Sequence, residues 1–170
     1  TRVEEDEPDV IPSGAWARRG PEIAIFSDGA ALSSDVAGAA LSVLFRGTKV
    51  SWLGVKCTIC GIATVSIDGG TETAVDTAGS TAPGTPGLTS EVVFTAADLA
   101  DDVHSLRITV TGNSSSSGGH ILVDAFDVAN GTADEGGGSG ATDVLWLSLL
   151  SLLAAAVRVP RQRFSRCRDA

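Results

Sequence analysis

The chain has 170 residues, 43% of them hydrophobic, with 20 glycines and neither tyrosine nor methionine. That length suits one domain with appendages, and glycines at this frequency argue against a helical bundle. Residues 1–143 carry 7 basic and 20 acidic side chains, whereas residues 158–170 carry 5 and 1, and an acidic body with scattered basic residues excludes a nucleic-acid-binding surface.

The first 13 residues are strongly acidic. Five carboxylates precede Pro12, at Glu4, Glu5, Asp6, Glu7 and Asp9, and such a density of charge is costly to bury. We therefore expect residues 1–13 to form an acidic, solvated linker. The chain opens at Thr1 without an apolar signal region, so we expect any export signal to lie upstream in a longer protein.

Residues 14–129 contain short apolar runs separated by turn-forming residues, which is the pattern of β-strands. Residues 39–45 alternate with a period of two, which places their apolar side chains on one face. Residues 50–55 follow after a turn at Gly47. We expect these two strands to form a hairpin.

A second hairpin is predicted further along the chain. Residues 62–67 alternate and lead into Asp68-Gly69-Gly70, where the glycines permit the positive φ that a tight turn requires. Residues 73–76 form the returning strand.

Three further strands are predicted after a Gly-, Pro- and Thr-rich loop at residues 79–89. They are residues 91–95, residues 121–128, and between them residues 104–111, in which Leu106, Ile108 and Val110 face inward. Seven or eight short strands without intervening helices predict an all-β fold. We expect a jelly-roll β-sandwich over residues 14–129.

Several motifs stand in an order that resembles a known module. They are Gly-Ala-Ala at 38–40 leading to Phe-Arg-Gly-Thr-Lys-Val-Ser-Trp-Leu-Gly at 45–54, Gly-Ile-Ala-Thr-Val-Ser-Ile-Asp-Gly at 61–69, the segments 99–106 and 109–112, and Val-Asp-Ala-Phe-Asp-Val at 123–128. Together they resemble a galactose-binding-like jelly-roll module that recurs as an accessory domain of bacterial extracellular proteins, often beside hydrolase or protease domains. The resemblance covers roughly residues 1–128 and implies carbohydrate or cell-envelope binding, although the fold by itself identifies no ligand.

Trp16 and Trp52 are the only tryptophans of this module. Their rings are the candidates for ligand binding by stacking on a sugar. Because the chain has no tyrosine and few other rings, we interpret each tryptophan as packed in the core or against a sheet, with sugar stacking as the alternative.

Cys57 and Cys60 form a Cys-x-x-Cys pair between two predicted strands. A zinc site would need two further ligands that the sequence does not supply at a matching spacing. A thioredoxin-like motif would open a helix in a βαβ setting. We therefore predict a structural disulfide across this turn.

The remaining polar residues form no catalytic pattern. No Gly-x-Ser-x-Gly motif accompanies His104 and His120, the only histidines, and we expect His104 to make a structural hydrogen bond. Asp124 and Asp127 stand three apart in a strand and so face opposite ways, unlike the carboxylate pair of a glycoside hydrolase. The sequence therefore predicts a protein that is not an enzyme.

The acidic residues could also hold a metal. In this fold, Asp28, Asp35 or Asp124 together with loop carbonyls could bind a structural calcium ion. No spacing signature supports such a site, so we expect no cofactor and keep structural calcium as the alternative.

The chain after residue 129 divides into three segments. Residues 130–143 form a Gly-rich linker with almost nothing to bury. Residues 144–157 carry no charge and predict a hydrophobic helix of about 21 Å, short for a hydrocarbon core of about 30 Å. Residues 158–170 form an Arg-rich tail that would stay in the cytoplasm and leave the sandwich outside, with arginines at Arg158, Arg161, Arg163, Arg166 and Arg168.

This order of segments resembles the C-terminal sorting signals of Gram-negative bacteria, in particular the GlyGly type processed by a rhomboid-like intramembrane protease. The resemblance rests on the helix, the arginines and the run Gly136, Gly137, Gly138, Ser139 and Gly140. It implies cleavage near these glycines and release or re-anchoring of the sandwich at the cell surface. A permanent membrane anchor and a buried core helix are the alternatives.

The sequence as a whole predicts a non-catalytic extracellular binding or adhesion module of a larger surface or secreted protein. Its expected partners are a glycan or cell-envelope component, the membrane and a sorting protease, with no nucleic acid. The alternative is a structural spacer that displays an upstream domain at the cell surface and binds no ligand.

Overall fold

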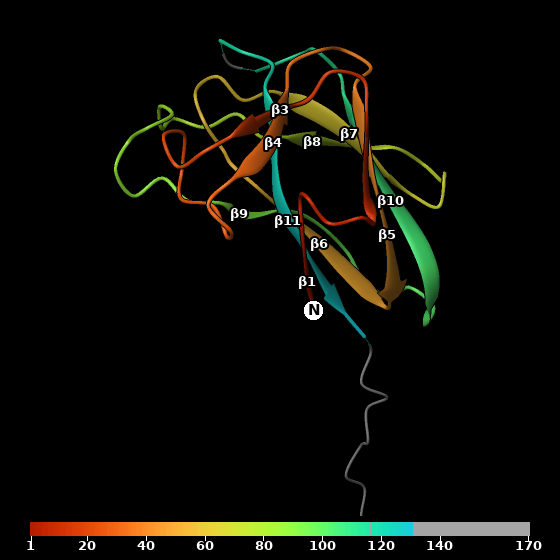
Figure 1. The fold of residues 1–170 in the computed structure, drawn as a ribbon. Helices are drawn as coiled ribbons and strands as arrows, with labels where there is room; N and C mark the ends of the chain where they lie inside the picture. The colour runs from red at the N-terminus through yellow and green to blue at the C-terminus, as the bar shows by residue number, and fades with distance from the viewer. Residues whose placement is uncertain (116, 131–170) are drawn as a thin grey trace, which may run out of the picture. The chain divides into compact units, whose positions relative to one another are not determined.

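The computed structural model describes residues 1–115 and 117–130, which form two antiparallel β-sheets (Figure 1). The six-stranded sheet has β3 (Ala17–Arg19), β4 (Ala31–Ser34), β11 (Ile121–Ala129), β6 (Lys49–Gly54) and β9 (Glu91–Ala96) in that order, and β1 (Arg2–Glu4) pairs with β11 beside this path. The five-stranded sheet has the order β2 (Val10–Ser13), β5 (Ala40–Gly47), β10 (Asp102–Val110), β7 (Ile62–Ile67) and β8 (Thr73–Asp76). The predicted all-β sandwich is confirmed.

The core lies between the two sheets and follows the predicted alternation. Leu106, Ile108 and Val110 of β10 are at most 1% exposed, as expected for its inward face. The largest side chains that are fully buried come from both sheets and include Trp52, Phe126, Leu41, Leu106, Ile108 and Ile121. Burial of each large aliphatic side chain contributes about 1.5–3 kcal/mol, so this layer dominates the stability of the sandwich.

The hairpin of β7 and β8 is confirmed, with Ile62 opposite Asp76 and Val65 opposite Thr73. The hairpin predicted around Gly47 is wrong. β5 pairs with β2 and β10, whereas β6 pairs with β11 and β9, so the chain crosses from one sheet to the other here. At this corner a Cβ on Gly47 would lie 2.7 Å from the Ala129 carbonyl oxygen. Alternation within a strand does not specify its neighbour, which is why the sequence pattern did not distinguish a corner from a hairpin.

The acidic linker predicted for residues 1–13 is also wrong. β1 pairs with β11 and β2 pairs with β5, so this segment contributes one strand to each sheet. Its charge is partly neutralised, because Arg18 Nη1 lies 3.0 Å from Asp6 Oδ2 and Arg18 Nη2 lies 3.3 Å from Glu5 Oε1. The sandwich therefore begins at the N-terminal end of the described chain rather than at residue 14.

Both faces of β11 are covered. Every residue from 121 to 126 is buried, because Ile121 and Val123 face the main core while Leu122 packs in a second cluster. That cluster includes Phe26, Val55 and the two cysteines. The second cluster anchors the segment between β3 and β4 on the outer side of the six-stranded sheet.

The loops that connect the strands gather at two ends. The end beside the start of β11 carries residues 55–61, 77–90 and 111–120, and we call it the loop end. The N-terminus lies at the opposite end, where the Val128 N–H donates to the Thr1 carbonyl (Figure 1).

The predicted linker, hydrophobic helix and Arg-rich tail lie outside the described residues from residue 131 onward. Among the residues that are described, no helix is long and apolar enough to cross a membrane.

Candidate functional site

A small hollow opens on the outer side of the six-stranded sheet at the loop end. Its volume is about 180 Å³. Its lining combines three apolar with three polar side chains, Ile23, Ile59, Leu122, Arg19, Ser33 and His120. We call it the loop-end hollow. Its apolar wall can contact C–H groups of a ligand while the polar side chains donate and accept hydrogen bonds.

Strands and loops from distant parts of the sequence position these side chains. Ser33 of β4 and Leu122 of β11 are opposite each other in the sheet register, and Arg19 ends β3. His120 precedes β11, and its Nε2 lies 3.7 Å from Asp35 Oδ2. The hollow therefore depends on the six-stranded sheet being assembled.

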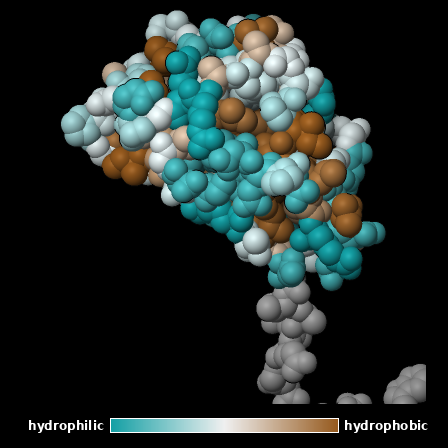
Figure 2. Space-filling view, viewed as in Figure 1, coloured by the Kyte–Doolittle hydropathy of each residue, from teal (hydrophilic) through white to brown (hydrophobic). Residues whose placement is uncertain are grey.

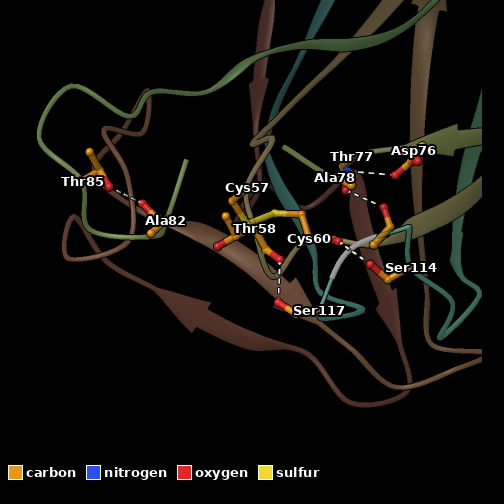
Figure 3. Close-up of a disulfide and its surroundings, with 11 residues drawn as sticks. Cys57, Thr58, Cys60, Asp76, Thr77, Ala78, Ala82, Thr85, Ser114 and Ser117 are labelled. Carbon is orange, nitrogen blue, oxygen red and sulfur yellow. Dashed lines mark hydrogen bonds between the residues drawn. A yellow bond between two sulfur atoms is a disulfide. The ribbon is translucent and has the colours of Figure 1, made fainter. Parts of the chain in front are cut away.

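The predicted disulfide between Cys57 and Cys60 is present, and both cysteines are fully buried (Figure 3). The turn between them is tied to two neighbouring loops. The Thr58 N–H donates to the Thr81 carbonyl at 3.0 Å, and the Ser117 hydroxyl donates to the Thr58 carbonyl at 3.0 Å. Because the turn is held on both sides, Ile59 has a defined position in the wall of the hollow.

Gly118 shows how tightly these loops are packed. A Cβ at this position would overlap the Ile59 carbonyl, so only glycine allows the loop before β11 to approach the disulfide turn. The His120 N–H in turn donates to the Ile59 carbonyl at 3.1 Å.

A larger, more open hollow is lined in part by Lys56, the residue that precedes this turn. It has a volume of about 610 Å³ and is lined mainly by residues 79–81 and 85–89, with Lys56 and Glu91. Lys56 Nζ lies 3.8 Å from Glu91 Oε1. Segment 56–60 thus supplies residues to both hollows, Lys56 to this one and Ile59 to the loop-end hollow.

A cluster of three carboxylates lies where β1 meets β11. One oxygen each of Glu4, Glu5 and Asp124 lies within 4.8 Å of the others. Asp124 is fully buried and sits where the register of β11 against β6 shifts. The Ser27 N–H donates to Asp124 Oδ1 at 3.0 Å, so Asp124 accepts a backbone donor.

Glu5 is the unusual member of this cluster, because the residue is 2% exposed and neither carboxylate oxygen accepts a hydrogen bond from another residue. Burial raises its pKa, and its own backbone N–H, followed by the charge of Arg18, only partly opposes this. The Ser27 hydroxyl lies 2.6 Å from Glu4 Oε2 and 3.0 Å from Asp124 Oδ1, but its single proton can serve only one of them. The three carboxylates therefore offer more hydrogen-bond acceptors than there are donors from described residues to pair with them.

An all-oxygen donor set of this kind fits a hard divalent cation such as Ca²⁺. Of the three aspartates named for the alternative of a structural calcium site, only Asp124 belongs to the cluster. Asp35 instead faces His120, and Asp28 lies in an exposed turn. The two glutamates come from a segment expected to be a linker, and the long sequence separation from Asp124 leaves no local motif to reveal the set.

The two tryptophans are packed to different degrees. Trp52 is fully buried in the core. Trp16 is half-buried against the core, and its indole N–H donates to the Ala40 carbonyl at 3.0 Å. Throughout residues 1–115 and 117–130, every aromatic side chain is buried or half-buried. The packing interpretation is therefore confirmed for Trp52, whose buried ring cannot stack on a sugar, and the partial burial of Trp16 is consistent with it.

Sequence reasoning did not find the residues of the loop-end hollow, apart from His120 as an unassigned histidine. Arg19 and Ser33 have no motif around them, and Ile59 lies inside the Cys-x-x-Cys pair, which predicted the disulfide but not a binding wall. The proposed sorting residues Gly136 to Gly140 and the tail arginines lie outside the described residues.

No family model and no curated protein matches the sequence. Solved structures do share its fold. The CBM35 module from Cellvibrio japonicus Abf62 has a TM-score of 0.57 at 15% identity, covering 78% of this chain and 95% of that module. The family 35 carbohydrate-binding module from Clostridium thermocellum has a TM-score of 0.51 at 16% identity, covering 76% of this chain and 98% of that module.

A Paenibacillus xanthan lyase also matches, with a TM-score of 0.56 at 20% identity over 76% of this chain. This chain spans 13% of the lyase. At such identities the likeness shows the fold alone. The fold is an all-β sandwich of two antiparallel sheets, of the jelly-roll kind seen in these carbohydrate-binding modules.

Proposed function

We propose that this chain is a non-catalytic carbohydrate-binding module that works outside the cell and binds its ligand in the loop-end hollow. The observation that carries the proposal is the meeting of an apolar wall with Arg19, Ser33 and His120 in one hollow. A sugar presents an apolar C–H face and a rim of hydroxyls, and this lining offers partners for both.

Two further observations support the proposal. The solved structures of which the chain covers nearly the whole length are carbohydrate-binding modules by name. The buried disulfide suits an oxidising, extracellular compartment.

The dimensions of the hollow limit the ligand. About 180 Å³ is below the roughly 300–1,000 Å³ of pockets for drug-sized ligands, so the hollow accommodates one sugar residue, such as a chain end or a branch. Because no aromatic platform is exposed among the described residues, affinity rests on hydrogen bonds and on the aliphatic wall.

The test is a glycan array followed by titration calorimetry with the full chain. The variant Ile59→Asp places a charge in the apolar wall and His120→Ala removes a rim donor, so each should weaken binding at least about tenfold, the equivalent of roughly 1.4 kcal/mol. The matched control is Val92→Asp on β9, at a side chain 53% exposed and outside the hollow. Absence of any glycan ligand for the wild type would overturn the proposal and leave the spacer hypothesis.

The same proposal includes structural calcium in the carboxylate cluster. Glu4, Glu5 and Asp124 would supply the carboxylate oxygens, and the ion would neutralise charge that the described residues leave uncompensated. The ion would thereby stabilise the pairing of β1 with β11.

Display at the cell surface through residues 136–168 also belongs to the proposal. Intact-mass analysis of membrane and supernatant fractions of the native host tests it. A species that ends near Gly136 to Gly140 would support cleavage by a sorting protease, and an uncleaved chain confined to the membrane would make residues 144–157 a permanent anchor.

A further inference from the structure

Cations are scarce in the sandwich, and most of them are paired. Residues 1–130 contain seven basic and seventeen acidic side chains. Four of the seven form ion pairs, namely Arg2, Arg18, Arg46 and Lys56. Arg107 belongs to the minority without an ion pair or hydrogen bond to any described residue.

Arg107 lies in the middle of a sheet face. β10 is the central strand of the five-stranded sheet, and since Leu106 and Ile108 point into the core, Arg107 points outward. Its cross-strand neighbours are Ser42 of β5 and Ser66 of β7. The guanidinium is therefore presented on the exposed face.

Hydroxyl groups surround this arginine. Ser42 and Ser66 flank it in one cross-strand row, and Thr109 and Thr64 are paired in the next row of the same face. None of these four side chains donates a hydrogen bond to another described residue or accepts one from it, although Ser66 is only 7% exposed. On the other sheet, by contrast, the hydroxyls of Ser51 and Thr95 form a hydrogen bond with each other at 2.9 Å.

We propose that this outer face of the five-stranded sheet is a second glycan-binding surface, selective for polysaccharides that carry oxyanion groups. This inference rests on the proposed carbohydrate-binding function but uses a different surface. The planar guanidinium of Arg107 binds a carboxylate or sulfate through two parallel hydrogen bonds. The four hydroxyls bond to the sugar hydroxyls around that group.

The charge of the whole module makes the arginine decisive. A domain with an excess of acidic residues repels a polyanion, so general electrostatic attraction does not hold an anionic glycan here. An anionic glycan is instead held by direct contact with Arg107. Because this site is exposed, added salt weakens the binding.

Affinity gel electrophoresis of the full chain tests the inference. The gels contain polygalacturonate for carboxylates, dextran sulfate for sulfates, or dextran as the neutral polymer. We expect retardation by one of the anionic polymers and not by dextran, and an at least about fivefold weaker apparent affinity in Arg107→Gln. Lys49→Gln is the control, because it removes an equally unpaired charge at an exposed position of β6 on the other sheet.

Two results would overturn the inference: no retardation in either anionic gel, or equal loss in Lys49→Gln and Arg107→Gln. Thermal unfolding of both variants checks that they remain folded. The Ile59→Asp variant separates the two surfaces, because it should keep its retardation by the polyanion. If the chain binds a polyanion in the gel but no glycan on the array, the loop-end hollow is rejected as a binding site and this face is supported. If it binds a glycan on the array but no polyanion in the gel, only this face is rejected.

Discussion

Glu5 is the residue whose burial in the sandwich is most costly. A carboxylate that is 2% exposed and accepts no hydrogen bond from another residue costs several kcal/mol when ionised, unless a cation compensates it. Arg18, whose Nη2 lies 3.3 Å from Glu5 Oε1, has a half-exposed side chain and pairs with Asp6 through Nη1. A divalent ion shared by three carboxylates offsets the cost more fully.

This yields a prediction for Glu5→Gln. In wild type, calcium at about 100 times its Kd should stabilise the fold by about 2.7 kcal/mol, measured as a rise in Tm relative to EDTA. The amide should abolish most of this response, while its Tm in EDTA should equal or exceed that of wild type because a buried charge has gone. Asp28→Asn, outside the cluster, should respond like wild type. A wild-type Tm that is insensitive to calcium would refute the site.

His104 presents a second residue-scale prediction. Its Nδ1 lies 2.7 Å from Asp68 Oδ2 and its Nε2 lies 2.9 Å from the Ala100 carbonyl. The hydrogen bond to Asp68, followed by that to Ala100, raises the pKa of His104. The Ser105 N–H, followed by His104, lowers the pKa of Asp68. His104 of β10 thus links the β7–β8 turn, through Asp68, to the loop before β10, through Ala100.

The sign of the pH dependence follows from these two shifts. The stability contributed by His104 is fully present below its ordinary pKa of about 6.5 and is lost as pH rises through the raised pKa. That of Asp68 is lost as pH falls through its lowered pKa. Between about pH 6 and pH 9, the wild-type Tm should therefore fall more than that of His104→Gln. His120→Gln is the control, and its Tm should fall with pH as steeply as that of wild type. If the Tm of His104→Gln also falls as steeply as that of wild type, the prediction is contradicted.

At the scale of elements, the first 13 residues join the two sheets. β1 extends the pairing of β11, and β2 covers the edge of β5. Val10 is 7% exposed and belongs to the main core. The segment therefore acts as part of the sandwich although its composition is that of a linker.

Deletion of residues 1–13 distinguishes these two interpretations. The truncated chain should lose more than about 2 kcal/mol of unfolding free energy, because burial of Val10 alone contributes about 1.5–3 kcal/mol and two strand pairings are lost as well. Urea unfolding of the full and truncated chains measures the difference. Equal midpoints would restore the linker hypothesis.

The disulfide turn is the second decisive element. Cys57 and Cys60 are only three positions apart, so the bond closes a short loop and its entropic contribution is small for a disulfide. Its contribution to function is local, since it shapes the segment that supplies Lys56 to one hollow and Ile59 to the other.

At the scale of the whole sandwich, the face that Figure 2 shows has apolar side chains in patches among hydrophilic ones. The exposed large apolar residues are Ile11, Ile25, Val36, Leu44, Val92 and Val103. They come from strands and loops of both sheets. Recognition by this module is therefore expected to depend on polar groups arranged by the sandwich, at the loop-end hollow and around Arg107.

The sequence by itself determined the fold class and most strands. Period-two alternation identified β7 to the residue and β10 to within two residues, because burial of one face enforces that period. The turn after β7 located β8, and an apolar run located β11, which is buried on both faces. The Cys-x-x-Cys spacing determined the disulfide, because two cysteines so close in one turn need no other part of the chain to meet.

Only the tertiary structure decided which strands are neighbours and which side chains share a site. The corner at Gly47, the entry of residues 1–13 into both sheets, and the meeting of Glu4 and Glu5 with Asp124 all depend on contacts between distant segments. The loop-end hollow and the row of Ser42, Arg107 and Ser66 arise in the same way. Local patterns record which face of a strand is buried, whereas a binding surface is made by the register between strands, which no single segment encodes.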